Sequence, residues 1–148
     1  MACILLTGAS GYIASHTWLA LKDAGFDVVG IDSFVNSSPR VLDRIASIGG
    51  FQPEFIQGDV RDAAALDRCF ELGAQFGGIS AVVHFAALKA VGESVERPLD
   101  YFENNLGGLL SVCQAMKRHG VHNVVFSSSA TVYGKPERLP ITEDAPLR

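Results

Sequence analysis

The feature that most constrains the fold is a glycine-containing turn between a short apolar segment and a helical one. Residues 3–6 read Cys-Ile-Leu-Leu, which predicts a buried strand, and residues 15–22 have a helical pattern. The intervening residues 7–14 read Thr-Gly-Ala-Ser-Gly-Tyr-Ile-Ala. Gly8 permits a tight turn, Gly11 lets a pyrophosphate approach the backbone, and the small Ala14 lets the helix lie close to the strand.

The helix that follows this turn would offer free N–H groups and a partial positive charge to a phosphate. The glycine spacing is Gly-x-x-Gly-x-x-Ala, and small residues also occur at ordinary tight turns between a strand and a helix. The segment therefore predicts a dinucleotide phosphate site, with a plain turn as the alternative.

Five apolar segments alternate with helical patterns along the chain. The strands are expected at 3–6, 27–31, 54–57, 81–85 and 123–126, and further helices at 39–48, 63–76 and 99–119. Alternating strands and helices with right-handed crossovers form a parallel sheet covered on both faces. The sequence therefore predicts an α/β fold with a doubly wound parallel sheet of the Rossmann type, in the order 3-2-1-4-5.

Composition limits the classes of function. The 148 residues fit one domain, 48% of them are hydrophobic, and the net charge is −4 with Lys and Arg scattered. No nucleic-acid partner, membrane contact or metal site is predicted, and the absence of a leader, a long apolar stretch or a lipidation motif predicts a cytoplasmic protein. Cys3, Cys69 and Cys113 are expected to be reduced thiols in the core.

Two acidic residues follow predicted strands. Asp32 lies 18 residues beyond Ala14, where a dinucleotide-binding fold places a carboxylate that accepts hydrogen bonds from ribose hydroxyls. Such a carboxylate repels a 2′-phosphate and so favours NAD over NADP; the alternative is a helix-cap or loop aspartate. Asp59 could accept a hydrogen bond from the adenine amine, or could stabilise a turn.

Further polar residues accompany the last two strands. His84 lies within an apolar strand and is predicted to be a hydrogen-bonded core histidine. Lys89, in the loop expected at residues 86–94, could approach a phosphate or be an ordinary surface lysine. Asn104 and Asn105 lie mid-helix, where asparagine is a mediocre helix former, and suggest a buried or ligand-facing hydrogen bond. Three serines, ending at Ser129, follow the fifth strand, where open α/β sheets hold substrate.

These segments resemble the extended short-chain dehydrogenase/reductase family, and within it the sugar-nucleotide 4-epimerases. The matching stretches are residues 7–16, 58–62, 84–95, 98–108 and 125–134. The most specific of them is residues 84–94, which read His-Phe-Ala-Ala-Leu-Lys-Ala-Val-Gly-Glu-Ser. Three residues depart from the family pattern: Ala14 replaces a third glycine, Ser33 an asparagine and Ala87 a glycine.

The resemblance implies an NAD-dependent enzyme that interconverts UDP-glucose and UDP-galactose by transient oxidation at C4. A tyrosine base and a neighbouring lysine would act with NAD, and Ser129 would help to position the reacting hydroxyl of a UDP-hexose. The resemblance also implies a homodimer formed through helix surfaces, with the helix that begins near Pro98 as the candidate. The implied cofactor-binding residues are Gly8, Gly11, Tyr12, Ile13, Asp32, Asp59, Val60, Phe85, Ala86, Lys89 and Asn104.

The family's Tyr-x-x-x-Lys pair does not occur in this sequence. None of the tyrosines, at positions 12, 101 and 133, has a lysine four residues later. Residues 1–148 are therefore expected to form an incomplete NAD-binding domain that lacks the substrate domain, is inactive alone and leaves its fifth strand as an unpaired edge. The alternatives are a related sugar-nucleotide dehydratase or decarboxylase, and a non-catalytic NAD-binding module.

Overall fold

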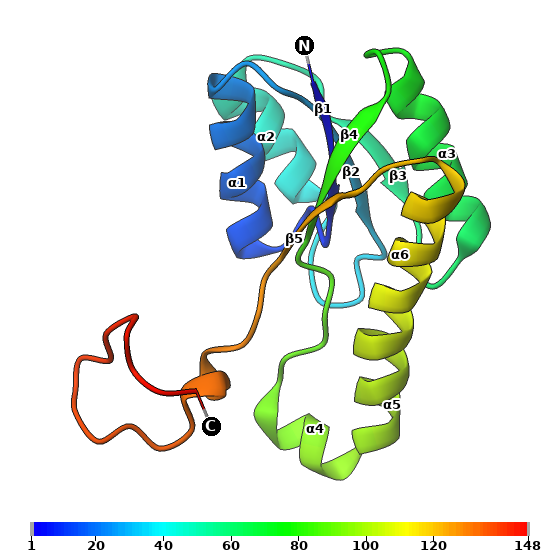
Figure 1. Ribbon diagram of the computed structural model, residues 1–148. Coiled ribbons are helices and arrows are strands. Elements are labelled where there is room, and N and C mark those ends of the chain that lie inside the picture. The colour runs from blue at the N-terminus through cyan, green and yellow to red at the C-terminus, as the bar shows by residue number, and fades with distance from the viewer. Residues whose placement is uncertain (1, 148) are drawn as a thin grey trace.

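The central element is a parallel sheet of five strands. A computed structural model describes residues 2–147 and places these strands in the order β3-β2-β1-β4-β5, with every pair parallel (Figure 1). The predicted fold class and strand order are therefore confirmed. The strands are β1 (Cys3–Thr7), β2 (Asp27–Asp32), β3 (Glu54–Gln57), β4 (Ile79–His84) and β5 (Asn123–Phe126).

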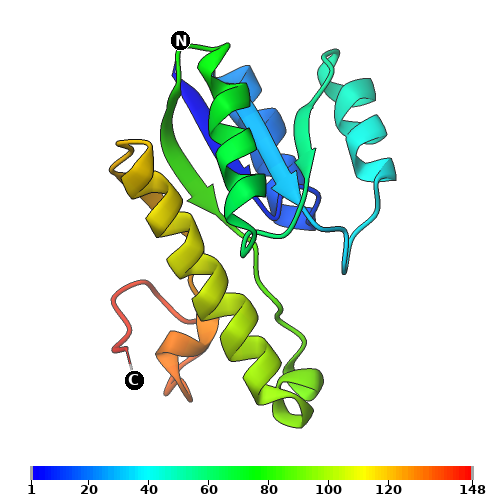
Figure 2. The ribbon, with the colours of Figure 1, turned by 90° about the vertical axis from the view of Figure 1, so that its right-hand side faces the viewer.

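Helices cover both faces of the sheet (Figures 1 and 2). On one face lie α1 (Tyr12–Asp23) and α2 (Arg40–Gly49), and on the other lie α3 (Ala63–Ala74) and α6 (Gly108–Arg118). Each pair of helices buries its apolar stripe against the strands, which gives two core clusters separated by the sheet. The side chain of Asp62 accepts a hydrogen bond from the Ala64 N–H at 2.9 Å and so begins α3.

The helix predicted over 99–119 is one helical segment with an irregular turn inside it. It comprises α5 (Pro98–Phe102), a π-helical turn η1 (Glu103–Gly107) and α6, and its first part extends beyond the sheet (Figure 2).

Residues 91–94, which were expected to be loop, belong to the short helix α4 (Val91–Glu96). This prediction was wrong because the first turn of α4 is fixed by contacts with the long helix, such as that between the Ala90 N–H and the Tyr101 hydroxyl.

Gly30, in β2, has no side chain and so makes room for Trp18, the largest core residue. The indole of Trp18, on α1, is completely buried. A Cβ atom at Gly30 would collide with the six-membered ring of Trp18 and lie 2.8 Å from the Ala9 Cβ. Gly30 therefore allows α1 to pack directly on the centre of the sheet.

The three cysteines have different environments. Cys3 and Cys69 are buried free thiols, and burial raises the pKa of Cys3 to about 11 and that of Cys69 to about 12. Cys113 is also a free thiol but is exposed, so its assignment to the core was wrong. Its neighbours Val112 and Met116 occupy the face of α6 that packs on the sheet, and Cys113 lies outside that face.

β5 is an edge strand, as predicted. Among the described residues it pairs with β4 alone, and all four of its residues are exposed, including Val125 and Phe126. Beyond it the described chain forms a short 3-10 helix η2 (Ala130–Tyr133) and then irregular loop to residue 147. Within residues 2–147 no helix has both the length and the apolar character needed to span a membrane.

Candidate functional site

The candidate site lies at the carboxyl ends of the strands, where β1 turns into α1. Gly8 has a φ of +64°, a conformation that favours glycine. A Cβ atom there would lie 2.8 Å from the Ala86 nitrogen and 2.9 Å from the Ala86 Cα. Gly8 therefore makes the tight turn that its position predicts, and it also lets this turn contact the backbone that follows β4.

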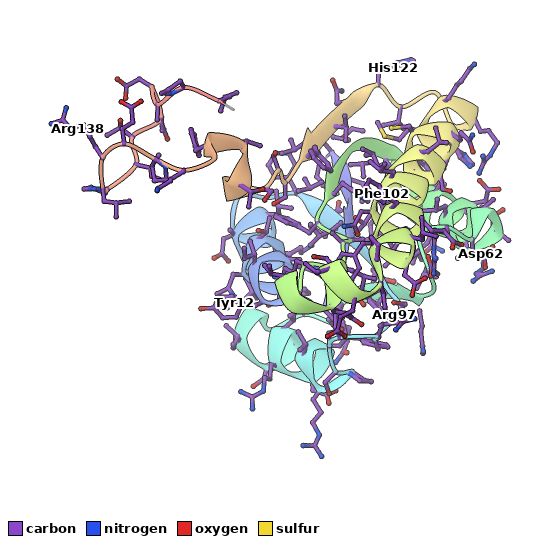
Figure 3. The ribbon with its side chains drawn as sticks, turned by 90° about the horizontal axis from the view of Figure 1, so that it is seen from below. Tyr12, Asp62, Arg97, Phe102, His122 and Arg138 are labelled. Carbon is purple, nitrogen blue, oxygen red and sulfur yellow. The ribbon has the colours of Figure 1, made fainter. Side chains whose placement is uncertain are left out.

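The N-terminus of α1 is open to an anion. Gly11 is its N-cap, and within residues 2–147 no side-chain hydrogen bond caps the first turn. Among residues 2–147, and apart from the chain neighbours of Gly11, the one atom within 4 Å of a Cβ placed on Gly11 would be the Gly8 carbonyl oxygen, at 3.1 Å. Tyr12 and Ile13 are 79% and 55% exposed, and Figure 3 shows the Tyr12 side chain at the periphery when the molecule is viewed from this end. The uncapped N–H groups and the space beside Gly11 fit a phosphate.

A buried threonine connects the ends of β1 and β4. The Thr7 hydroxyl lies 2.8 Å from the His84 Nδ1 and accepts a hydrogen bond from the Ala86 N–H at 3.2 Å. His84 is 2% exposed, and burial lowers the pKa of its imidazole, which favours the neutral ring. His84 is thus the hydrogen-bonded core histidine that the sequence predicts.

The carboxylate of Asp32, at the end of β2, organises the loop around it. Oδ2 accepts from the Ser10 N–H at 3.1 Å, and Oδ1 accepts from the Phe34 N–H at 2.9 Å and the Ser37 hydroxyl at 3.4 Å. Asp32 is 9% exposed. It is therefore a loop-stabilising aspartate, one of the two roles considered above. A carboxylate has about four acceptor positions, so these donors leave capacity for a ribose hydroxyl.

Asp59 stabilises a turn and forms an ion pair. Its carboxylate accepts from the Arg61 backbone N–H at 2.8 Å and from the Arg61 guanidinium at 2.6–3.1 Å. The guanidinium also lies 3.6 Å from a carboxylate oxygen of Glu103, in the π turn. Hydrogen bonding to Arg61 lowers the pKa of Asp59. Between the two residues of the pair, Val60 is 6% exposed and packs against Gly108 at the start of α6.

The segment after β4 carries three of the predicted cofactor-binding residues. Phe85 and Ala86 are half-buried beside the Gly8 turn, and Lys89 is exposed. Within residues 2–147 Lys89 has no hydrogen bond or ion pair, so its ammonium is available to a ligand.

The π turn brings two asparagines to this segment. Asn105 accepts from the Leu88 N–H at 2.8 Å and donates to the Leu88 carbonyl at 2.9 Å, and Asn104 donates to the Asn105 Oδ1 at 2.9 Å. Only Asn104 is among the residues implied by the resemblance, so the contact of Asn105 was missed. The signal available in the sequence was the asparagine pair in mid-helix, which indicates a hydrogen bond but not its partner.

Ser129 lies apart from the residues above, at the start of η2. Its hydroxyl accepts from the Thr131 N–H at 3.2 Å and is 2.7 Å from the Thr131 hydroxyl. Ser129 therefore caps η2 and is exposed. In the described chain its hydroxyl contacts none of the other predicted site residues.

Comparison with known proteins identifies the family. Residues 4–148 match the model of the NAD dependent epimerase/dehydratase family. The chain belongs to this family. UDP-glucose 4-epimerases from Pasteurella multocida and Bacillus subtilis are 54% and 50% identical to it, over 95% and 97% of its length. The chain spans 40% and 41% of the length of these two relatives.

Solved structures of this family share the fold. The chain superposes with a TM-score of 0.89 and 46% identity on UDP-glucose 4-epimerase from Bifidobacterium longum in complex with NAD+ and UDP. A second UDP-glucose 4-epimerase, from Stenotrophomonas maltophila, has bound NAD and formylated UDP-arabinopyranose and gives a TM-score of 0.88 at 43% identity. These comparisons cover 99% and 100% of this chain and 43% of each of the other chains.

The ion pair between Asp59 and Arg61 predicts a pH dependence. The pKa of Asp59 is lowered from its ordinary value of 3.8, so its contribution to stability is present above that value and lost as the pH falls through the lowered pKa. The contribution is below about 1 kcal/mol because the pair is partly exposed. A carboxyl ¹³C titration should place Asp59 below 3.8 in the wild type and higher in Arg61→Gln.

Arg44→Gln is the matched control because Arg44 is exposed on α2 and makes no ion pair within residues 2–147. This control should leave the titration of Asp59 unchanged. The same midpoint in the wild type and in Arg61→Gln would contradict the role given to Arg61.

Proposed function

We propose that residues 1–148 form the NAD-binding part of an enzyme that interconverts UDP-glucose and UDP-galactose. The observation that carries the proposal is the phosphate cradle of Gly8 and Gly11, with the uncapped N-terminus of α1 and a carboxylate at the end of β2. The similarity to UDP-glucose 4-epimerases over 95% or more of this chain supports the same function.

The proposed cofactor site lies at the carboxyl ends of β1 and β4, where the chain leaves these paired strands for opposite faces of the sheet. NAD bound at this site would supply a hydride acceptor and donor for transient oxidation at C4 of the sugar. The backbone at Gly8, Gly11, Tyr12 and Ile13 holds the pyrophosphate, and Asp32 accepts from the adenosine ribose. Asp59 and Val60 border the adenine, whereas Phe85, Ala86, Lys89 and Asn104 line the pyrophosphate and nicotinamide side.

The proposed substrate is a UDP-hexose whose reacting hydroxyl is oriented by Ser129. Ser129 is exposed, and the partners of its hydroxyl in the described chain are the N–H and hydroxyl of Thr131, so the hydroxyl is accessible to a ligand. Removal of the C4 proton needs a base whose pKa is adjusted by a neighbouring cation. The tyrosine and lysine that do this in the family are not among the 148 residues.

We also propose that the natural enzyme is a homodimer formed through the outer face of α5, η1 and α6. Five exposed side chains lie three or four residues apart along that face, and such spacing produces an apolar stripe on one side of a helix. They are Leu99, Phe102, Leu106, Leu110 and Cys113.

A cytoplasmic location is proposed as well, which the free thiols of the described chain support.

The first test is NAD binding by the 148-residue chain. Isothermal titration should detect NAD binding, and Asp32→Ala should weaken it at least about tenfold because the ribose loses its acceptor. Asp23→Ala is the matched control, since Asp23 is an exposed aspartate at the far end of α1. Absence of binding by the wild type would overturn the proposed cofactor site, and equal affinity in Asp32→Ala would overturn the role of Asp32.

A second test concerns turnover. The 148-residue chain with NAD should not convert UDP-galactose to UDP-glucose, because it lacks the tyrosine base and its lysine. Protein isolated from its natural source should catalyse this conversion, followed by proton NMR of the two sugars. Turnover by the 148-residue chain would contradict the assignment of the base, and its absence in the natural protein would overturn the proposed reaction.

The proposed dimer can be tested by sedimentation of the natural gene product. Leu106→Glu should convert a dimer to a monomer, because a charge in the middle of the apolar stripe is costly to bury. Leu139→Glu is the control, since Leu139 is 81% exposed but lies in the loop after η2. A monomeric wild type, or a Leu106→Glu variant that remains dimeric, would exclude this interface.

A further inference from the structure

The loop between β4 and α4 is held by side chains at every second residue. The Ala86 N–H donates to the Thr7 hydroxyl, the Leu88 N–H to Asn105 and the Ala90 N–H to the Tyr101 hydroxyl. Within residues 2–147 the N–H groups of the two intervening residues, Ala87 and Lys89, donate no hydrogen bond. The protein therefore holds the N–H groups of Ala86, Leu88 and Ala90 in hydrogen bonds and leaves those of Ala87 and Lys89 available to a ligand.

Two of the three anchors come from one face of the long helix. Tyr101 and Asn105 are four residues apart, a spacing that places side chains next to one another on a helix. They hold the residues on either side of Lys89, namely Leu88 and Ala90. The position of the Lys89 backbone is thus set by α5 and the π turn rather than by contacts of its own.

Asn105 is the stronger of these two anchors because it binds both backbone groups of Leu88. Its amide accepts from the N–H at 2.8 Å and donates to the carbonyl at 2.9 Å. Such a pair of bonds sets the orientation of the Leu88 backbone as well as its distance from the long helix. The same Oδ1 also accepts from Asn104, so one side chain aligns the loop with a residue of the proposed cofactor site.

We propose that Asn105 is a positioning residue for the nicotinamide half of the site: by clamping both backbone groups of Leu88 from the π turn, it fixes the loop that presents Lys89. This inference rests on the proposed NAD site. A π turn inside an α-helix is uncommon, and where it occurs it is frequently found at a functional site. This agrees with a role for η1 beyond packing. Asn105 itself need not touch the cofactor.

The test compares two ligands that use different parts of the site. AMP occupies the adenosine side near Asp32 and lacks the second phosphate and the nicotinamide half, whereas NAD also extends over the loop after β4. In the 148-residue chain, Asn105→Ala should weaken NAD binding about tenfold, as expected for loss of a partly buried clamp, and leave AMP affinity unchanged. Asn123→Ala is the matched control: it removes a single amide bond to the Ser80 carbonyl, at the start of β5, and should alter neither affinity.

Hydrogen exchange supplies a readout that does not depend on NAD. The Leu88 amide should exchange about tenfold faster in Asn105→Ala than in the wild type, and the Asn123→Ala variant should leave it unchanged. If Asn105→Ala loses its circular dichroism, Asn105→Ser, which leaves a hydroxyl for the freed partners, is measured in the same way.

The outcomes separate this inference from the proposed function. No NAD binding by the wild type would overturn the proposed cofactor site and this inference with it. Normal NAD binding by the wild type with unchanged affinity in the Asn105 variant would overturn the positioning role alone. An equal loss of NAD and AMP affinity would also overturn it, because general destabilisation would then explain the effect.

Discussion

The contact between the Gly8 turn and the Phe85–Ala86 backbone is the constraint on which the rest of the site depends. No side chain fits between them, since even a Cβ atom at Gly8 would approach the Ala86 nitrogen to 2.8 Å. This contact fixes the point at which the chain leaves β1 for one face of the sheet and leaves β4 for the other. The Thr7 hydroxyl reinforces it by bonding to His84 and to the Ala86 N–H. A ligand placed at this junction meets backbone atoms of both halves of the fold.

Local sequence signals predicted much of this architecture. The five strands, their order and the tight turn at Gly8 followed from apolar periodicity and from residues with restricted roles in turns. His84 was placed correctly because its neighbours in the strand are apolar. These features depend on short stretches of chain, so a single sequence contains the information needed to predict them.

Features that depend on distant partners were not predicted. The helix α4, the π turn and the bond from Asn105 to Leu88 all arise where the segment after β4 packs against the long helix. The exposure of Cys113 depends on which face of α6 meets the sheet. The roles in cofactor binding given to Asp32 and Lys89 came from their positions after predicted strands and from the family resemblance, and their surroundings in the structure suit those roles.

The acidic residues of the site illustrate how a binding surface is prepared in advance. Asp32 is held by two backbone N–H groups and a serine hydroxyl, and Asp59 by Arg61. Each carboxylate is oriented before any ligand arrives, which lowers the conformational cost of binding. Lys89 differs, because its backbone position is fixed through its neighbours while its side chain stays free in the described chain.

The strand order β3-β2-β1-β4-β5 has a consequence for synthesis of the chain on the ribosome. β2 and then β3 extend the sheet on one side of β1, and β4 and then β5 extend it on the other. Every strand can therefore join an existing edge in the order in which it emerges, and none has to enter between two paired strands. Because proteins are made from the N-terminus, the nascent sheet can grow stepwise, with β5 joining after the other four strands described here.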